Sequence, residues 1–96
     1  MTEAKLILKI RDWLNDQPET YAWRNHGGPH GTRGMVDIGC VHAGRFYGFE
    51  VKLPGKEHTL TKIQTRNLQK IRRAGGVAEM VTSVEQVKEV LYGNKG

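Results

Sequence analysis

The sequence predicts an α/β fold, with a small mixed β-sheet flanked by helices and elements in the order αβββαβα. Three observations support this fold class. Apolar residues recur at helical spacing in several segments, short runs rich in β-branched and aromatic residues lie between them, and glycine or proline marks the boundaries. At 96 residues, the chain is expected to form a single domain spanning residues 1–96.

The N-terminal part is expected to hold one helix, one strand and one loop. Residues 3–15 carry apolar side chains at helical spacing, and Pro18 ends the pattern. Residues 20–24 are aromatic and β-branched, which favours a short strand. Residues 25–34 contain four glycines and a proline, so we expect a loop there.

A β-hairpin is expected next. Residues 35–41 and 46–53 are both rich in β-branched and aromatic residues, and Ala43-Gly44 between them suits a tight turn. A second loop, at residues 54–58, follows directly after the hairpin.

The C-terminal part is expected to form a helix, a short strand and a final helix. Thr61-x-x-Gln64 is a capping-box pattern that opens a helix running to about Ala74. Residues 77–81 then favour a strand. A second capping-box pattern, at residues 83–86, opens the last helix.

Composition narrows the partners and the compartment. The net charge of +5 and the pI of about 9.6 suit an anionic partner, nucleic acid first and a membrane surface second. The single cysteine, Cys40, lies in an expected strand and is interpreted as a small buried side chain rather than a nucleophile. No segment approaches 18 apolar residues, so we expect a soluble, cytoplasmic protein.

Asp37, Glu50 and Lys52 are the most informative side chains of the chain. Because side chains alternate along a strand, Glu50 and Lys52 point to one face of the hairpin, and Asp37 on the neighbouring strand can face the same way. Two carboxylates on a hydrophobic sheet are costly unless a cation or the lysine neutralises them. A hard divalent metal with oxygen ligands is therefore the natural candidate.

The chain resembles the PD-(D/E)XK nuclease superfamily, whose pattern x-D-(x)n-E-x-K matches these three residues. Within that superfamily it most resembles the VRR-NUC family, the virus-type replication-repair nucleases. That family usually has proline directly before the aspartate, whereas this chain has Val36, which leaves the aspartate in place. The matching segments are Trp23-Arg24-Asn25, the glycine-rich stretch to Gly34, residues 34–38, 48–52, Leu60-Thr61-x-x-Gln64 and Gly75-Gly76-Val77.

The resemblance implies a restriction-endonuclease-like core and a metal-dependent active site. Asp37, Glu50 and the backbone carbonyl of Val51 would bind Mg²⁺, with Mn²⁺ able to substitute. Lys52 would hydrogen-bond the attacking water, and we favour a positioning and electrostatic role over general base because neighbouring carboxylates keep a lysine charged. The products would carry 5′-phosphate and 3′-hydroxyl ends.

Two further residues have competing interpretations. Glu3 matches a family position from which a glutamate reaches the metal, but a glutamate in a first helical turn also interacts well with the helix dipole. Gln64 matches a family glutamine near the active site, but it also completes the Thr61 capping box. For Glu3 the alternatives stay open, and for Gln64 we favour the catalytic interpretation.

Basic residues cluster around the expected site in sequence. On the functional interpretation they hold DNA phosphates, and on the alternative they form a solvated helix surface. The candidates for nucleic-acid binding are Arg24, Arg33, Lys56, Lys62 and Arg66.

The sequence thus predicts an Mg²⁺-dependent, structure-selective DNA endonuclease. Stand-alone VRR-NUC domains of this size resemble phage or bacterial proteins and homodimeric Holliday-junction resolvases, which implies branched DNA as the substrate and a homodimer. The alternative is a non-catalytic DNA-binding or assembly domain that keeps the nuclease fold. The intact set of Asp37, Glu50 and Lys52 favours the enzyme.

Overall fold

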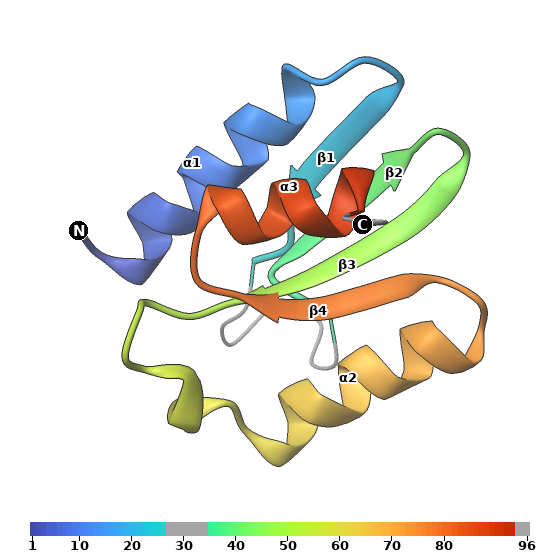
Figure 1. The fold of residues 1–96 in the computed structure, drawn as a ribbon. Helices are drawn as coiled ribbons and strands as arrows, with labels where there is room; N and C mark the ends of the chain where they lie inside the picture. Colours follow the sequence, from blue (N-terminus) through green and yellow to red (C-terminus); the bar gives the residue numbers. More distant parts are fainter. Residues whose placement is uncertain (27–34, 94–96) are drawn as a thin grey trace.

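The computed structural model describes residues 1–26 and 35–93 and confirms the α/β class and the αβββαβα order (Figure 1). A mixed sheet has the strand order β1-β2-β3-β4, antiparallel between its first three strands and parallel between β3 and β4. Its form is compatible with a nuclease-like core. The elements are α1 (Glu3–Asn15), β1 (Thr20–Arg24), β2 (Ile38–His42), β3 (Arg45–Val51), the 3₁₀ helix η1 (Glu57–Thr59), α2 (Lys62–Arg73), β4 (Val77–Val81) and α3 (Val84–Tyr92).

The hairpin forms as expected, but its first strand starts later than the sequence predicts. His42 pairs with Arg45, so Ala43 and Gly44 are the whole turn, and their positive φ angles of 49° and 80° are those that a two-residue turn favours. Strand β2 begins at Ile38 rather than at residue 35, and β3 ends at Val51 rather than at residue 53.

Of the two predicted capping boxes, the one at the start of α2 is confirmed and the one at the start of α3 is only partly correct. The Thr61 capping box is complete, because the Thr61 hydroxyl accepts from the Gln64 N–H and the Gln64 side chain accepts from the Thr61 N–H. At α3, Ser83 accepts from the Gln86 N–H at 3.1 Å. The Gln86 side chain, however, accepts from the Thr82 N–H at 2.7 Å and so holds the chain leaving β4 instead of the cap residue.

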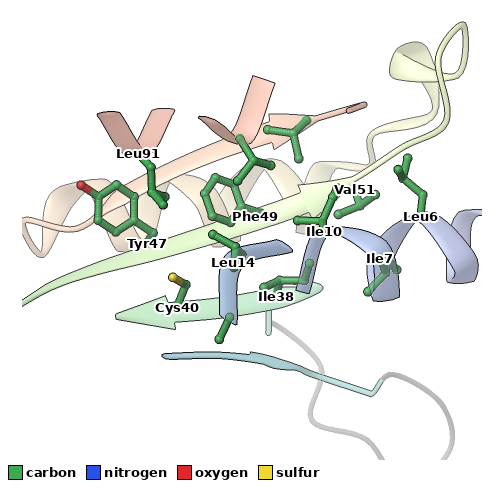
Figure 2. Close-up of a cluster of buried hydrophobic side chains, with 13 residues drawn as sticks. Leu6, Ile7, Ile10, Leu14, Ile38, Cys40, Tyr47, Phe49, Val51 and Leu91 are labelled. Atoms are coloured by element: carbon green, nitrogen blue, oxygen red, sulfur yellow. The ribbon is translucent and has the colours of Figure 1, made fainter. Parts of the chain in front are cut away.

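The larger hydrophobic core lies on one face of the sheet, beneath α1 and α3 (Figures 1 and 2). Ile10 and Leu14 of α1 are fully buried against Phe49 and its neighbours on β2 and β3. Cys40 is also fully buried there, as expected, and burial raises the pKa of its thiol to about 11. Such a thiol stays protonated and is a poor nucleophile.

The opposite face carries a smaller apolar cluster beneath α2. Val36, Leu68 and Ala78 are its buried members. Gly48 of β3 allows the close approach of the helix, since a Cβ added there would lie only 2.5 Å from the Ile71 side chain. Helix α2 therefore sits tightly over β3 and β4, which fixes its buried side chains against the end of β3 that carries Glu50.

No helix within residues 1–26 and 35–93 combines the length and the apolar character needed to span a lipid bilayer.

Candidate active site

Asp37 and Glu50 come together at the end of the hairpin that lies away from its turn. They lie one residue beyond the Ile38–Phe49 pair, the last in the β2–β3 register. The Val51 N–H donates to Asp37 Oδ2 at 2.8 Å, and the Asp37 N–H donates to Glu50 Oε1 at 3.3 Å. Each carboxylate is thus held by a backbone N–H from the opposite side of the hairpin, which fixes the pair in place.

The same contacts explain why β2 begins late. In a longer antiparallel ladder, the Val51 N–H would pair with the backbone before Ile38. Here the Asp37 carboxylate accepts from that N–H, and the Asn25 side-chain amide donates to the Val36 carbonyl at 2.9 Å. Side-chain hydrogen bonds therefore replace the β2–β3 ladder at Asp37, the first carboxylate of the candidate site.

Glu50 is a buried acid with an unused oxygen. Its side chain is 1% exposed, and Oε2 has no hydrogen-bond partner among the residues that the structure describes. A buried polar atom without a partner is uncommon, because leaving it unsatisfied costs free energy. This oxygen is therefore available to a ligand that the described residues do not supply.

Electrostatics around Glu50 favour a bound positive charge. The pKa of Glu50 is raised from 4.5 to about 7, first by burial, then by the negative charge of Asp37 and by a side-chain hydrogen bond with it. A hydrogen bond from the Asn67 side chain lowers the pKa by a smaller amount. Near pH 7 the acid is close to half protonated, and a cation beside both carboxylates would favour the fully ionised pair.

Asn67 is a site residue that the sequence reasoning missed. It is 4% exposed on α2 and lies beside Leu68, on the side of the helix that packs against the sheet. A signal was present, since Asn67 is three residues after Gln64, and residues at this spacing share a helical face. The buried amide of Asn67 supplies a polar contact to Glu50, at a site where the sequence favoured Gln64.

Lys52 lies two residues after Glu50 and, by strand alternation, on the same face. It is 7% exposed, and its backbone N–H donates to the Val81 carbonyl at 3.0 Å. Within the described part of the chain, the ion pairs do not include Lys52. The two carboxylates are therefore not neutralised by this ammonium in the free protein.

Val51 points as expected: its side chain is fully buried in the larger core, on the opposite face from Glu50. The proposed role of its carbonyl as a metal ligand stays a prediction.

Gln64 is half-buried, and its side-chain oxygen accepts from the Thr61 N–H at 3.0 Å. The capping interpretation accounts for this oxygen, and a catalytic role for Gln64 stays a prediction.

Glu3 lies in the first turn of α1, directly after the N-cap residue Thr2. Over residues 1–26 and 35–93, no group of three or more His, Cys, Asp or Glu side chains is close enough to hold a metal ion. The structure therefore does not bring Glu3 into such a group with Asp37 and Glu50. The favourable interaction with the helix dipole is sufficient to explain its position.

The basic candidates lie mostly on the surface. Lys56 is exposed in the loop after β3, and Lys62 and Arg66 are exposed on α2, whereas Arg24 is half-buried at the end of β1. Arg33 lies outside the described residues. The exposed helix surface fits either the phosphate-binding or the solvated interpretation.

No protein-family model matches the chain, and no curated protein matches it. We therefore infer the function from the chain's own residues.

The donor set fits a small hard cation. Mg²⁺ typically binds through one or two carboxylates and completes its shell with water and substrate phosphate oxygens, so two acids are sufficient. Asp37 and the unpartnered Oε2 of Glu50 supply such oxygens. By contrast, structural zinc sites take four ligands, usually Cys and His.

Proposed function

We propose that the protein is an Mg²⁺-dependent DNA endonuclease that hydrolyses phosphodiester bonds. The observation that carries the proposal is the Asp37–Glu50 pair, held by two backbone N–H groups and left with a buried, unpartnered oxygen. A purely structural pair would be expected to satisfy that oxygen. Lys52 beside the pair adds the third group of the E-x-K pattern.

Each residue has a distinct task in this proposal. Asp37 and Glu50, with the Val51 carbonyl, hold the cation, which when bound neutralises phosphate charge and lowers the pKa of bound water. Lys52 donates a hydrogen bond to the attacking water or to the phosphoryl oxygen and stabilises charge there. Asn67 keeps the Glu50 side chain in one orientation through its hydrogen bond.

DNA is the proposed substrate because the chain is strongly basic. Exposed lysine and arginine side chains on α2, together with Lys56, would contact phosphates and make binding dependent on salt. Following the resemblance, we propose branched or junction DNA and a homodimer, since two sites related by a two-fold axis suit two symmetric nicks. The proposed setting is the cytoplasm of a bacterial or phage-infected cell.

The test is cleavage of labelled duplex, fork, flap and four-way DNA with Mg²⁺ or with EDTA. Asp37→Asn and Lys52→Ala should each lower the cleavage rate by a hundredfold or more, by the usual order of losses at electrostatic catalytic groups. Glu85→Gln and Lys88→Ala, exposed on α3, are the matched controls and should leave the rate unchanged.

Two outcomes would contradict parts of the proposal. Cleavage that survives Asp37→Asn would refute the site, and equal cutting of plain duplex would refute structure selectivity. DNA binding without cleavage under all metal conditions would favour the non-catalytic alternative.

A further inference from the structure

A second group of side chains lies on the same face of the sheet as the carboxylates. Tyr21 of β1, Val41 of β2 and Phe46 of β3 stand side by side in the strand register, and they are 67%, 40% and 36% exposed. Helix α2 packs against β3 and β4, so it does not cover the β1 and β2 part of this face. Three neighbouring strands therefore present apolar side chains that no helix or strand within residues 1–26 and 35–93 covers.

The aromatic rings in this region form a continuous row. The ring centroids of Tyr21 and Trp23 are 5.6 Å apart, and those of Trp23 and Phe46 are 6.2 Å apart. The interplanar angles are 36° and 47°, so each ring is tilted against the next rather than enclosed edge to face. The two outer residues of the row, Tyr21 and Phe46, are 67% and 36% exposed and so can contact a ligand.

Gly39 leaves the space that the Trp23 ring, the central ring of the row, occupies. Trp23 pairs with Gly39 across β1 and β2, and a Cβ added at Gly39 would lie 2.5 Å from the Trp23 indole. The indole thus rests directly on the backbone of β2, which only glycine at this position permits. Trp23 is held in place before any ligand arrives.

The aromatic row adjoins the carboxylate pair. Trp23 and Gly39 are a cross-strand pair, and Asp37 lies two residues before Gly39 on the same face. Two residues along a strand span about 7 Å. A nucleotide whose phosphate lies at Asp37 and Glu50 can therefore place its own base, or its neighbour's base, on the indole.

We propose that Tyr21, Trp23 and Phe46 form a stacking surface for unpaired nucleobases of the DNA that the carboxylate pair cleaves. This inference rests on the proposed function and names its substrate class: DNA with unpaired bases beside the scissile bond. Aromatic rings stack on every base and contribute to binding without sequence preference. In a duplex the base faces are already stacked on one another, so only unpaired bases gain from this surface.

Charge and size favour DNA over a second copy of the chain as the occupant. The chain carries a net charge of +5, which complements a polyanion. The exposed group has three side chains, Tyr21, Val41 and Phe46, whereas a stable protein–protein interface takes roughly 20–30 residues from each partner. Continuity with the carboxylate site gives the same DNA both a phosphate contact and a base contact.

The test is binding in EDTA, where cleavage does not occur. A Trp13→Phe variant of the full chain leaves Trp23 as its single tryptophan, so its fluorescence reports on the surface directly. Binding of an oligo(dT) strand should quench this fluorescence. Trp23→Leu and the exposed Tyr21→Leu, made in the wild-type chain, should each weaken oligo(dT) binding, by roughly fivefold to a hundredfold, and change duplex binding by less than about threefold.

Three results would overturn the inference: unchanged oligo(dT) binding, an equal loss for oligo(dT) and duplex, or dissociation of a dimer by Tyr21→Leu in sedimentation velocity. The unfolding midpoint of each variant shows whether its fold is intact, and Tyr21→Leu keeps the test decisive if Trp23→Leu unfolds. Because these readouts need no metal, failure of the stacking surface is distinct from failure of the nuclease proposal, which the Asp37→Asn cleavage assay detects separately.

Discussion

The two faces of the sheet differ in the kind of side chain that they bury. Phe49 and Glu50 are consecutive residues of β3 and are both almost fully buried, yet Phe49 enters the larger apolar core beneath α1 and α3, while Glu50 faces the other side of the sheet and contacts Asn67 of α2. Burial of a phenyl ring stabilises the fold, whereas burial of a carboxylate with an unpartnered oxygen opposes it. The first face stabilises the fold throughout, whereas the second combines an apolar cluster with a buried acid whose free-energy cost a bound cation would offset.

This difference indicates where function lies in a small domain. A chain of this length buries a limited core and has a small net free energy of unfolding. The cost of burying an unsatisfied acid is therefore large compared with that free energy. The acid is nevertheless positioned by backbone hydrogen bonds and by Asn67, which fixes its orientation. The α2 face is therefore interpreted as a preorganised site rather than a packing defect.

Phe49→Ala should be the most damaging single change to the fold. Truncation of a fully buried phenylalanine costs about 3–5 kcal/mol of the free energy of unfolding. Urea denaturation followed by circular dichroism measures the loss. Phe46→Ala, on the exposed part of the other face, is the control and should cost much less; equal losses would mean that the two faces do not differ as described.

Unlike Phe49→Ala, Glu50→Gln should increase the free energy of unfolding at high pH. Because the pKa of Glu50 rises from 4.5 to about 7 on folding, the folded state binds this proton more tightly. The stabilisation is fully present below pH 4.5 and is lost as the pH rises through 7. In EDTA, Glu50→Gln should therefore be more stable than wild type at pH 8, by about 2–3 kcal/mol, and similar to wild type near pH 5.

The measurement is urea denaturation at both pH values, with Glu85→Gln as the control for an exposed acid. Parallel pH dependence of wild type and Glu50→Gln would show that Glu50 is not the titrating group. Cleavage should be lost in Glu50→Gln even though its fold is stabilised.

Asn67→Leu should remove the amide contact to Glu50 while keeping the helix packed. Loss of a hydrogen bond to a buried charged group costs about 1.5–3 kcal/mol at pH 8 and less at pH 5, where the acid is protonated. The expected readout is a steeper fall of the unfolding midpoint with rising pH. Gln69→Leu, exposed on the same helix, is the control; an unchanged pH profile for Asn67→Leu would contradict the assigned role.

Thr61→Ala and Gln64→Ala should have the smallest effects and separate the two interpretations of Gln64. Loss of the N-cap hydroxyl costs about 1 kcal/mol of stability. If Gln64 acts only in the cap, Gln64→Ala should lower the unfolding midpoint by a similar or smaller amount and leave the cleavage rate equal to that of Thr61→Ala. A rate at least tenfold lower for Gln64→Ala would assign it to the active site.

The sequence was sufficient for the elements whose signals are local. Helical spacing placed α1, β-branched runs placed β1 and β4, and the Thr61 capping box placed the start of α2. Contacts that depend on the tertiary fold were less accessible. The late start of β2 follows from the Asp37 carboxylate, which takes an N–H that the ladder would use, and Gln86 leaves its cap to hold Thr82.

The candidate site likewise has residues that the sequence predicts and residues that only the tertiary fold reveals. Strand alternation was enough to place Asp37 and Glu50 together, because the hairpin turn fixes the register. The spacing from Gln64 placed Asn67 on the same face of α2, but the burial of Asn67 beside Glu50 depends on how closely the helix approaches Gly48, which the spacing does not show. The unpartnered oxygen of Glu50 is likewise a property of packing and not of any residue pattern.

The most direct test of the buried carboxylate pair as a cation site is calorimetric titration with Mg²⁺, repeated with Mn²⁺ and in buffers of different ionisation enthalpy. Wild type should bind the metal and release more protons at pH 6.5 than at pH 8, because the pKa of Glu50 is about 7 in the free protein. Glu50→Gln should bind weakly or not at all. Equal metal affinity in wild type and Glu50→Gln would contradict the account.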